Sequence, residues 1–400
     1  MGMVLVVSEA KQSENLEFSQ VMKVAVPIIR RSIKNGRRRQ GKGIPPRVIF
    51  RRFRRKVRQR EKHHRRNHGN RRWPILKRRS VELVRLYAPQ IIDLQSAVSR
   101  RDTLHLCERI RRVYLQDRKG VLIDFSRTRK IHSHGMLVLV AELDRAQRMS
   151  GGKLALRCKL PAGTDNDQKI VCEVLDQIGL LERCGHPKIH GEGCVFHESV
   201  RHWRYATGTR VDDKPGDVLE KHEGRIAPAL MTQMQIGLTE ALINSLHHAY
   251  RGLRSDGCGL YNERRWWMFT HEVDGVLQVL VCDLGIGIPR SLPLKWDHSL
   301  LKKLSQIFSK SHPHVAAIKS ALILGKSSTG EENRGKGLPQ IWSATSSTKG
   351  GAVGILSGKA YVYIDSEDGN VNGGPYESEF LGTLVTWRVP VDAVGVKTDD

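Results

Sequence analysis

Three polar side chains recur at helical spacing in the second half of this 400-residue chain. Glu240, Asn244 and His248 are spaced i, i+4 and i+8 within Gln233 to Arg251, a segment with the periodicity of an amphipathic helix. Burying such a row of polar side chains without hydrogen-bond partners costs free energy, so the row predicts a bound polar group. A Mg²⁺-phosphate group fits, because an asparagine carbonyl is a hard oxygen ligand suited to Mg²⁺. A carboxylate one turn away could orient or deprotonate a hydroxyl nucleophile.

A glycine-containing turn follows this helix after two apolar stretches. Trp266 to Val273 and Val276 to Cys282 are strand patterns on either side of Asp274-Gly275, which predicts a hairpin. The second strand leads directly into Asp283-Leu-Gly285-Ile-Gly287. The glycines permit a tight turn beside a base or phosphate. The Asp283 carboxylate could accept a hydrogen bond from an exocyclic amine such as that of adenine.

A second glycine pair lies further along, in Arg334-Gly335-Lys336-Gly337-Leu338, just before an apolar helix pattern through Ile341. Backbone N–H groups at such a helix start bind anions, and Lys336 adds positive charge. A Walker P-loop is excluded because Leu338 follows Gly337 where that motif needs Lys and then Ser or Thr. Pro289 to Arg334 has the length and mixed polarity of a mobile lid. Gly382-Thr383 begins a final alternating strand.

In this order, the four pieces resemble the GHKL superfamily, which includes histidine kinases, Hsp90, gyrase B, MutL and anti-sigma-factor kinases. The resemblance implies Mg²⁺ and ATP as cofactors, with Glu240 as general base, Asn244 on Mg²⁺ and Asp283 on adenine. It also implies a two-layer α/β sandwich with a mixed sheet over residues 226–392. The remaining residues implied for ATP binding are His248, Gly285, Gly287, Arg334, Gly335, Lys336, Gly337, Leu338 and Thr383.

The helix motif, extended to Tyr250, looks most like that of the serine kinases of anti-sigma factors. The segment Ser327 to Ile341 departs from that subfamily, and no phosphoacceptor helix of the sensor-kinase type precedes the ATPase. Three hypotheses stay open. The chain is a nucleotide-dependent regulator with ATPase or Ser/Thr kinase activity, a nucleic-acid-associated ATPase, or an ATP-binding scaffold without turnover.

Residues 81–185 predict a smaller α/β unit. Strand patterns at Val121 to Phe125 and Lys153 to Cys158 alternate with helix patterns at Gly135 to Met149 and Gln168 to Leu181. This order resembles the STAS domain of anti-anti-sigma factors, in which a serine before a helix-opening glycine is phosphorylated. That resemblance makes Ser133 the candidate phosphoacceptor and a partner-switch protein the candidate partner. The alternative is a serine that caps the helix.

The net charge of +26 is concentrated in the N-terminal arm, residues 1–80. Between Arg30 and Arg79 there is one acidic residue, Glu61, against about two dozen lysines and arginines. Such a block repels itself, so we expect a largely disordered arm. Phe50, Phe53 and Trp73 are interleaved with the basic residues and could stack on bases, which favours nucleic acid as a partner over a solvated arm.

Residues 186–225 have the composition of a linker. Cys184, His186, His190 and Cys194 cluster at its start, with His197 beyond, but their spacing matches no common zinc-finger pattern. We therefore interpret these histidines as solvated, with zinc as the alternative. The seven cysteines are scattered through apolar segments, and no transmembrane or signal segment is apparent, so we expect a reduced, cytoplasmic protein of bacterial type.

Overall fold

The computed structural model describes residues 82–163, 165–189, 196–201, 203–211, 228–256, 264–327, 350–365 and 371–391. The basic arm, the Arg334 to Leu338 segment and much of the expected linker lie outside these residues. None of the helices in the described ranges combines the length and the apolar character that crossing a lipid bilayer requires.

The first unit is built on a parallel three-stranded sheet of order β1-β3-β5. The strands are β1 (Leu83–Tyr87), β3 (Gly120–Asp124) and β5 (Leu156–Lys159), and a small parallel pair joins β2 (Ile91–Ile92) to β4 (Lys130–Ile131). The helical segments are α4 (Ala97–Arg111), η2 (Arg112–Gln116), α5 (Ser133–Met149), α6 (Asn166–Gln177), α7 (Leu180–Arg183) and α8 (Glu198–Arg201). The strand–helix alternation predicted for this region is therefore present, although the predicted second helix is divided between α6 and α7.

Glycines determine where the helices of this unit begin and end. A Cβ on Gly135 would lie 2.6 Å from the backbone nitrogen of Asp93, so only glycine lets α5 approach the β2 segment. Gly151 and Gly152 end the same helix with φ values of +73° and +68°, which favour glycine. Gly179, with φ +75°, separates α6 from α7.

The second unit contains a five-stranded sheet of order β6-β7-β8-β10-β9. Its strands are β6 (Arg204–Gly208), β7 (Trp266–Val273), β8 (Val276–Asp283), β9 (Ala352–Asp365) and β10 (Val371–Pro390). Every described pair in it is antiparallel, so the mixed sheet expected from the resemblance is wrong for these strands. The expected linker also contributes structure, because β6 pairs with β7 and extends the sheet.

One face of this sheet is covered by α10 (Pro228–Asn244), η4 (Ser245–Ala249), α11 (Ile288–Lys295) and α13 (Pro313–Ser327), and α12 (His298–Ile307) packs on α13. The last three helices occupy most of the segment predicted to be a lid. Leu304, Ile318 and Leu322 from these helices are at most 2% exposed and belong to the core. As far as Ser327, this segment is therefore packed structure rather than a loop over a site, because its apolar side chains follow helical periodicity.

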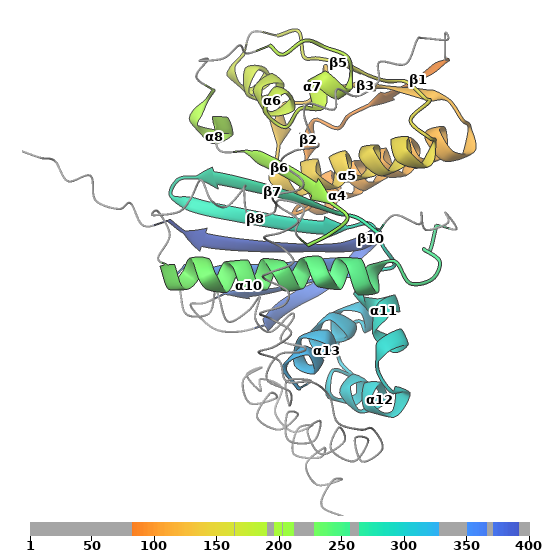
Figure 1. Ribbon diagram of the computed structural model, residues 1–400, viewed down its shortest axis with the longest axis vertical. Helices are drawn as coiled ribbons and strands as arrows, with labels where there is room; N and C mark the ends of the chain where they lie inside the picture. The colour runs from red at the N-terminus through yellow and green to blue at the C-terminus, as the bar shows by residue number, and fades with distance from the viewer. Residues whose placement is uncertain are drawn as a thin grey trace, which may run out of the picture.

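The other face of the sheet is covered by the first unit, so the sheet lies between helices of the two units (Figure 1). Figure 1 shows α4 and α5 above the sheet and α10 below it. Trp267, Phe269, Leu280 and Cys282 point from β7 and β8 into the core of the first unit. The mixed α/β class predicted from sequence is confirmed, and two α/β units share one sheet as their common wall.

Candidate functional site

The polar row predicted on a helix lies at the end of α10. Glu240 and Asn244 are half-buried, and Asn244 is the last α-helical residue. The chain then makes a π-helical turn, η4, which contains the half-buried His248. This turn rotates His248 away from the position it would hold in a continuous α-helix. Single π turns occur frequently at functional sites, because they re-aim side chains at small cost.

A lysine that the sequence analysis did not identify faces this row. Lys295, at the end of α11, interacts electrostatically with both Glu240 and His248. Burial raises the pKa of Glu240, and the positive charge of Lys295 opposes that change. Burial also lowers the pKa of His248 to about 4, with Lys295 and Arg251 acting in the same direction. His248 is therefore a neutral imidazole at physiological pH, and burial also lowers the pKa of Lys295, while the charge of Glu240 opposes that change.

Asp283 lies at the end of β8, on the sheet face covered by α10. Its side chain is 4% exposed, and Oδ1 accepts a 2.9 Å hydrogen bond from the backbone nitrogen of Gly285. The backbone N–H of Thr383 on β10 donates to the same carboxylate. Ser245 Oγ lies 3.5 Å from Oδ2, but it also approaches the carbonyl oxygen of Ala241 at 2.9 Å. Burial nevertheless raises the pKa of Asp283 to about 7.

The turn after Asp283 packs closely against η4. The Ile286 nitrogen donates to the Ala249 carbonyl at 2.7 Å, and a Cβ on Gly285 would lie 2.1 Å from that oxygen. Gly287 has φ +75°, and a Cβ there would lie 2.8 Å from Ser357 Oγ. Both glycines are therefore needed for the turn to close against η4 and β9.

Thr383 lies next to Asp283 on the neighbouring strand β10. Its register partner across the sheet is Asp283. The Ser357 hydroxyl on β9 accepts from the Ile288 nitrogen at 2.9 Å and donates to the Gly382 carbonyl at 2.8 Å, with Thr383 Oγ1 3.3 Å away. Ser357, which no sequence motif indicated, thus ties the turn to the Gly382-Thr383 strand.

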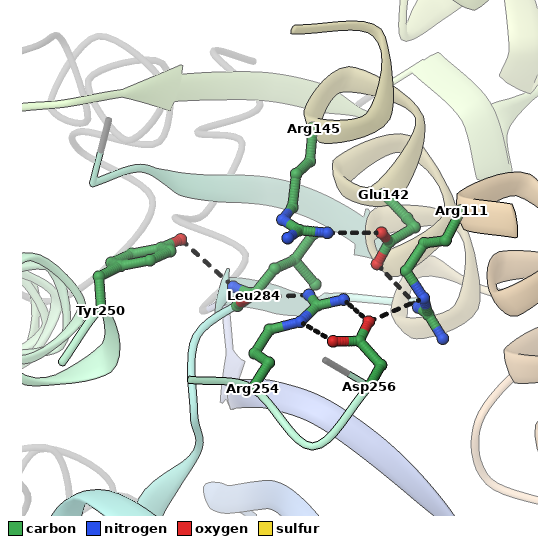
Figure 2. Close-up of polar contacts among 7 residues, drawn as sticks. All are labelled: Arg111, Glu142, Arg145, Tyr250, Arg254, Asp256 and Leu284. Carbon is green, nitrogen blue, oxygen red and sulfur yellow. Dashed lines mark hydrogen bonds and ion pairs between the residues drawn. The ribbon is translucent and has the colours of Figure 1, made fainter. Parts of the chain in front are cut away.

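A network of charged side chains contacts the Asp283 turn at Leu284 (Figure 2). Arg254, whose side chain is fully buried, donates from Nη1 to the Leu284 carbonyl at 3.1 Å and pairs with Asp256. Arg111 of α4 pairs with Asp256 at 3.3 Å and with Glu142 of α5 at 3.1 Å. The backbone of the turn is therefore connected to α4 and α5 of the first unit through four ionic side chains, Arg254, Asp256, Arg111 and Glu142.

Glu142 is the buried centre of this network. Its side chain is 1% exposed, and burial alone would raise its pKa. The charges of Arg111, Arg254 and Arg145 outweigh burial, so the pKa of Glu142 is lowered and the carboxylate stays ionised. A buried charge with three cationic neighbours fixes the relative position of the elements that supply them.

The candidate phosphoacceptor Ser133 lies in the contact between the units. It is 3% exposed and donates to Oε1 of Gln278 on β8 at 3.1 Å. Gln278 is five positions before Asp283, so their side chains point to opposite faces of the sheet. The N-cap of α5 is His132, so Ser133 does not fill the capping role considered as the alternative. Trp267 Nε1 also crosses this contact, donating to Asp144 of α5 at 3.0 Å.

The predicted cysteine–histidine cluster is only partly described. His186 Nε2 lies 2.9 Å from the Cys158 carbonyl, and Cys184 is a buried thiol. His190 and Cys194 lie outside the described residues. Within those residues, no group of three or more His, Cys, Asp or Glu side chains is arranged to hold a metal ion.

The structure thus brings Glu240, Asn244 and His248 onto one helix end. Asp283, Gly285 and Gly287 lie in the adjacent turn, and Thr383 lies beside Asp283 on β10. Arg334, Gly335, Lys336, Gly337 and Leu338 fall outside the described residues. Lys295, Ser245, Ser357 and Arg254 were not predicted, because each is an isolated polar residue whose role depends on the fold. No protein-family model, curated protein or solved structure matches the chain.

Proposed function

We propose that this chain is an ATP-binding regulatory protein of the GHKL type, with its nucleotide site at the junction of α10, η4 and the Asp283 turn. The proposal extends to the first unit, which we propose is STAS-like. The docked first unit would then respond to nucleotide through the Arg254–Asp256–Arg111 connection, because Arg254 holds the backbone of the turn that contacts adenine.

The observation that supports the proposal most strongly is the buried environment of the Asp283 carboxyl group. It is a buried carboxylate at a strand end, held by backbone donors from Gly285 and Thr383, and burial raises its pKa to about 7. A carboxylate has about four acceptor sites, so this one can still accept from a further donor. An exocyclic amine such as that of adenine would supply the donor and favour the ionised form.

The polar row at the end of α10 has the side chains needed to bind Mg²⁺ and the phosphates of ATP. Asn244 would offer a carbonyl oxygen to Mg²⁺, and Glu240 would act as general base on the reacting hydroxyl. The Mg²⁺ would neutralise phosphate charge when bound. Lys295, close enough to interact with Glu240, supplies a cation on the same side. Phosphorylation of Ser133 in the same chain would require the units to separate, because its hydroxyl is buried on the opposite sheet face.

Binding of a non-hydrolysable ATP analogue with Mg²⁺, measured by titration calorimetry on the full chain, tests the proposal. We expect Asp283→Asn to weaken binding about tenfold or more, because the amide loses the charge-assisted hydrogen bond. Asp274→Asn is the matched control, since Asp274 lies exposed at the other end of the hairpin and its φ of +51° suits asparagine. We expect the control to bind like the wild type.

Absence of binding to folded wild-type protein, or equal binding by both variants, would contradict the proposal. ATP turnover by the wild type and Glu240→Ala then separates catalysis from binding alone. Repeating the turnover assay with DNA or RNA tests the alternative of a nucleic-acid-associated ATPase. That alternative depends on Arg30 to Arg79, which lie outside the described residues.

A further inference from the structure

A polar cavity of about 250 Å³ opens between the two units, away from the Asp283 turn. The second unit supplies a row across three adjacent strands, because His271, Gln278 and Arg388 are register partners on β7, β8 and β10. The first unit supplies the start of α5 and Gln95, which precedes α4. The complete lining is Gln95, Ile131, His132, Ser133, His134, His271, Gln278 and Arg388.

The cavity has an exposed mouth and a buried floor. Arg388 and Gln95 are exposed, His134 and Gln278 are half-buried, and Ser133 at the floor is 3% exposed. Nδ1 of His134 is buried without a hydrogen-bond partner among the described residues. His134, which lines the cavity, therefore keeps beneath the cavity surface a nitrogen that the described residues leave without a partner.

The lining offers several hydrogen-bond donors and one positive charge, that of Arg388. Arg388 offers a guanidinium group, and His132 and His134 each carry an imidazole N–H, whereas His271 uses Nε2 on the Ser199 carbonyl oxygen at 3.0 Å. The cavity also receives the N-terminus of α5, a helix of 17 residues whose N-cap His132 makes no side-chain capping bond. Uncapped backbone N–H groups at a helix start favour anions. Asp93 is the opposing charge, since it interacts with both His132 and His134.

We propose that this cavity binds a small oxyanion, the phosphate or carboxylate group of a small molecule, through Arg388, His134 and the start of α5. The proposal is independent of ATP binding. A volume of about 250 Å³ lies just below the roughly 300–1,000 Å³ of pockets for drug-sized ligands, which indicates a small occupant. A metal ion is not favoured, because no described cluster of His, Cys, Asp or Glu has the arrangement to hold one.

Anion binding here is linked to protonation of the imidazoles. Burial, with the charges of His132, Arg388 and His271, lowers the pKa of His134 to about 4, while Asp93 opposes the change. Burial and Lys130 lower the pKa of His132, again against Asp93. A bound anion raises both pKa values, so binding takes up protons. Affinity should therefore increase as pH falls.

Sulfate is the first probe, because its charge is constant from about pH 8 to about pH 5, where imidazoles titrate. Titration calorimetry on the full chain should show sulfate binding that strengthens toward the lower pH, with proton uptake seen as buffer-dependent heat. We expect Arg388→Gln to weaken binding about tenfold or more. This variant should fold, because Arg388 is an exposed strand residue. Arg101→Gln, which alters an exposed arginine on α4 outside the cavity, should bind like the wild type.

A second variant keeps the contact between units intact. Gln278→Glu can still accept from Ser133 but places a negative charge against the cavity, so it should also weaken sulfate binding. Inorganic phosphate and succinate, titrated in the same way, distinguish a phosphate-bearing from a carboxylate-bearing occupant. Sulfate binding of equal strength in wild type, Arg388→Gln and Gln278→Glu would overturn the proposal. So would binding that is lost in Asp283→Asn and kept in Arg388→Gln, which would place the anion at the nucleotide site.

Discussion

At the scale of single residues, Asp283 shows two opposing effects on a carboxylate. Backbone N–H groups of Gly285 and Thr383 stabilise the ionised form and lower the pKa, whereas loss of water raises it. Burial is the larger effect, and the pKa is about 7. The side chain is therefore close to half protonated at neutral pH. A ligand donor can change its charge with little additional energy, which suits a switchable contact.

The raised pKa of Asp283 predicts a stability change with pH. The unfolded carboxyl ionises near its ordinary value of 3.8, so the folded state binds more protons between that value and about 7. Stability should then fall as pH rises through this range, by about 2 to 3 kcal/mol between about pH 5 and about pH 8. Urea unfolding of wild type and Asp283→Asn at both pH values measures the effect. The asparagine variant should lack this part of the pH dependence.

Asp274→Asn serves as the control for that comparison, because Asp274 is exposed and should leave the wild-type profile unchanged. Contributions of other titrating groups cancel when the variant and wild-type profiles are subtracted. Parallel profiles for wild type and Asp283→Asn would show that the carboxyl is not buried as described.

At the scale of elements, the candidate site depends on the close approach of β8 and β10. Gly382 on β10 has φ +132°, and a Cβ there would lie 2.0 Å from the Asp283 carbonyl oxygen. The register of β10 with β9 shifts between Phe380 and Thr383, so the strand is irregular at this point. Glycine lets β10 cross the Asp283 turn and still present the Thr383 N–H to the carboxylate.

Gly382→Ala should therefore destabilise the protein strongly, by more than about 2 kcal/mol, because the new methyl group meets backbone atoms that cannot move away. Gly354→Ala on neighbouring β9 is the matched control. A Cβ there would meet nothing within 4 Å, so its effect should be small or slightly stabilising. Urea unfolding gives both values. Similar costs for the two alanines would mean that β10 does not make this approach.

The success of sequence-based prediction differed among the elements. The β7–β8 hairpin was predicted within a residue of its bounds, because two apolar runs flank Asp274-Gly275. The sequence does not predict the helices α11 to α13 and indicates a lid there instead, since Pro289, Pro293 and several lysines obscure their periodicity. No strand was predicted at β9, where Gly354 and Gly358 interrupt the pattern. Short β6 was assigned to a linker because only its pairing with β7 identifies it.

The residues of the candidate site also differ in how well the sequence predicts them. Glu240, Asn244 and Asp283 were predictable because each carries a local signal, a helical spacing or a strand-end turn. Lys295 and Ser357 reach the site from other elements, so their roles follow from tertiary packing. The π turn of η4 was also not predictable, since Ser245 to Ala249 reads as a continuation of the helix.

At the scale of the whole molecule, one sheet contributes side chains to two hydrophobic cores, one on each of its faces. Most side chains of β7 and β8 are apolar, including neighbours such as Trp266 and Trp267, which point to opposite faces. Consecutive apolar residues in a strand indicate cover on both faces. That signal was present in the sequence but did not say what provides the cover. The structure assigns it to α4 and α5, and the ionic network of Figure 2 follows from that docking.

The docking of the two units predicts a measurable coupling between Arg111 and Asp256. Their side chains are 13% and 18% exposed and 3.3 Å apart, so water and salt screen the pair weakly. A double-mutant cycle with Arg111→Met and Asp256→Asn, measured by urea unfolding, should give a coupling energy of about 1 to 3 kcal/mol. The same cycle on Lys119 and Glu82, an exposed pair within the first unit, should give a clearly smaller coupling energy, because solvent screens it. A coupling no larger than that of the exposed pair would mean that α4 does not dock on the turn region in solution, and nucleotide bound at Asp283 would then have no ionic connection to the first unit.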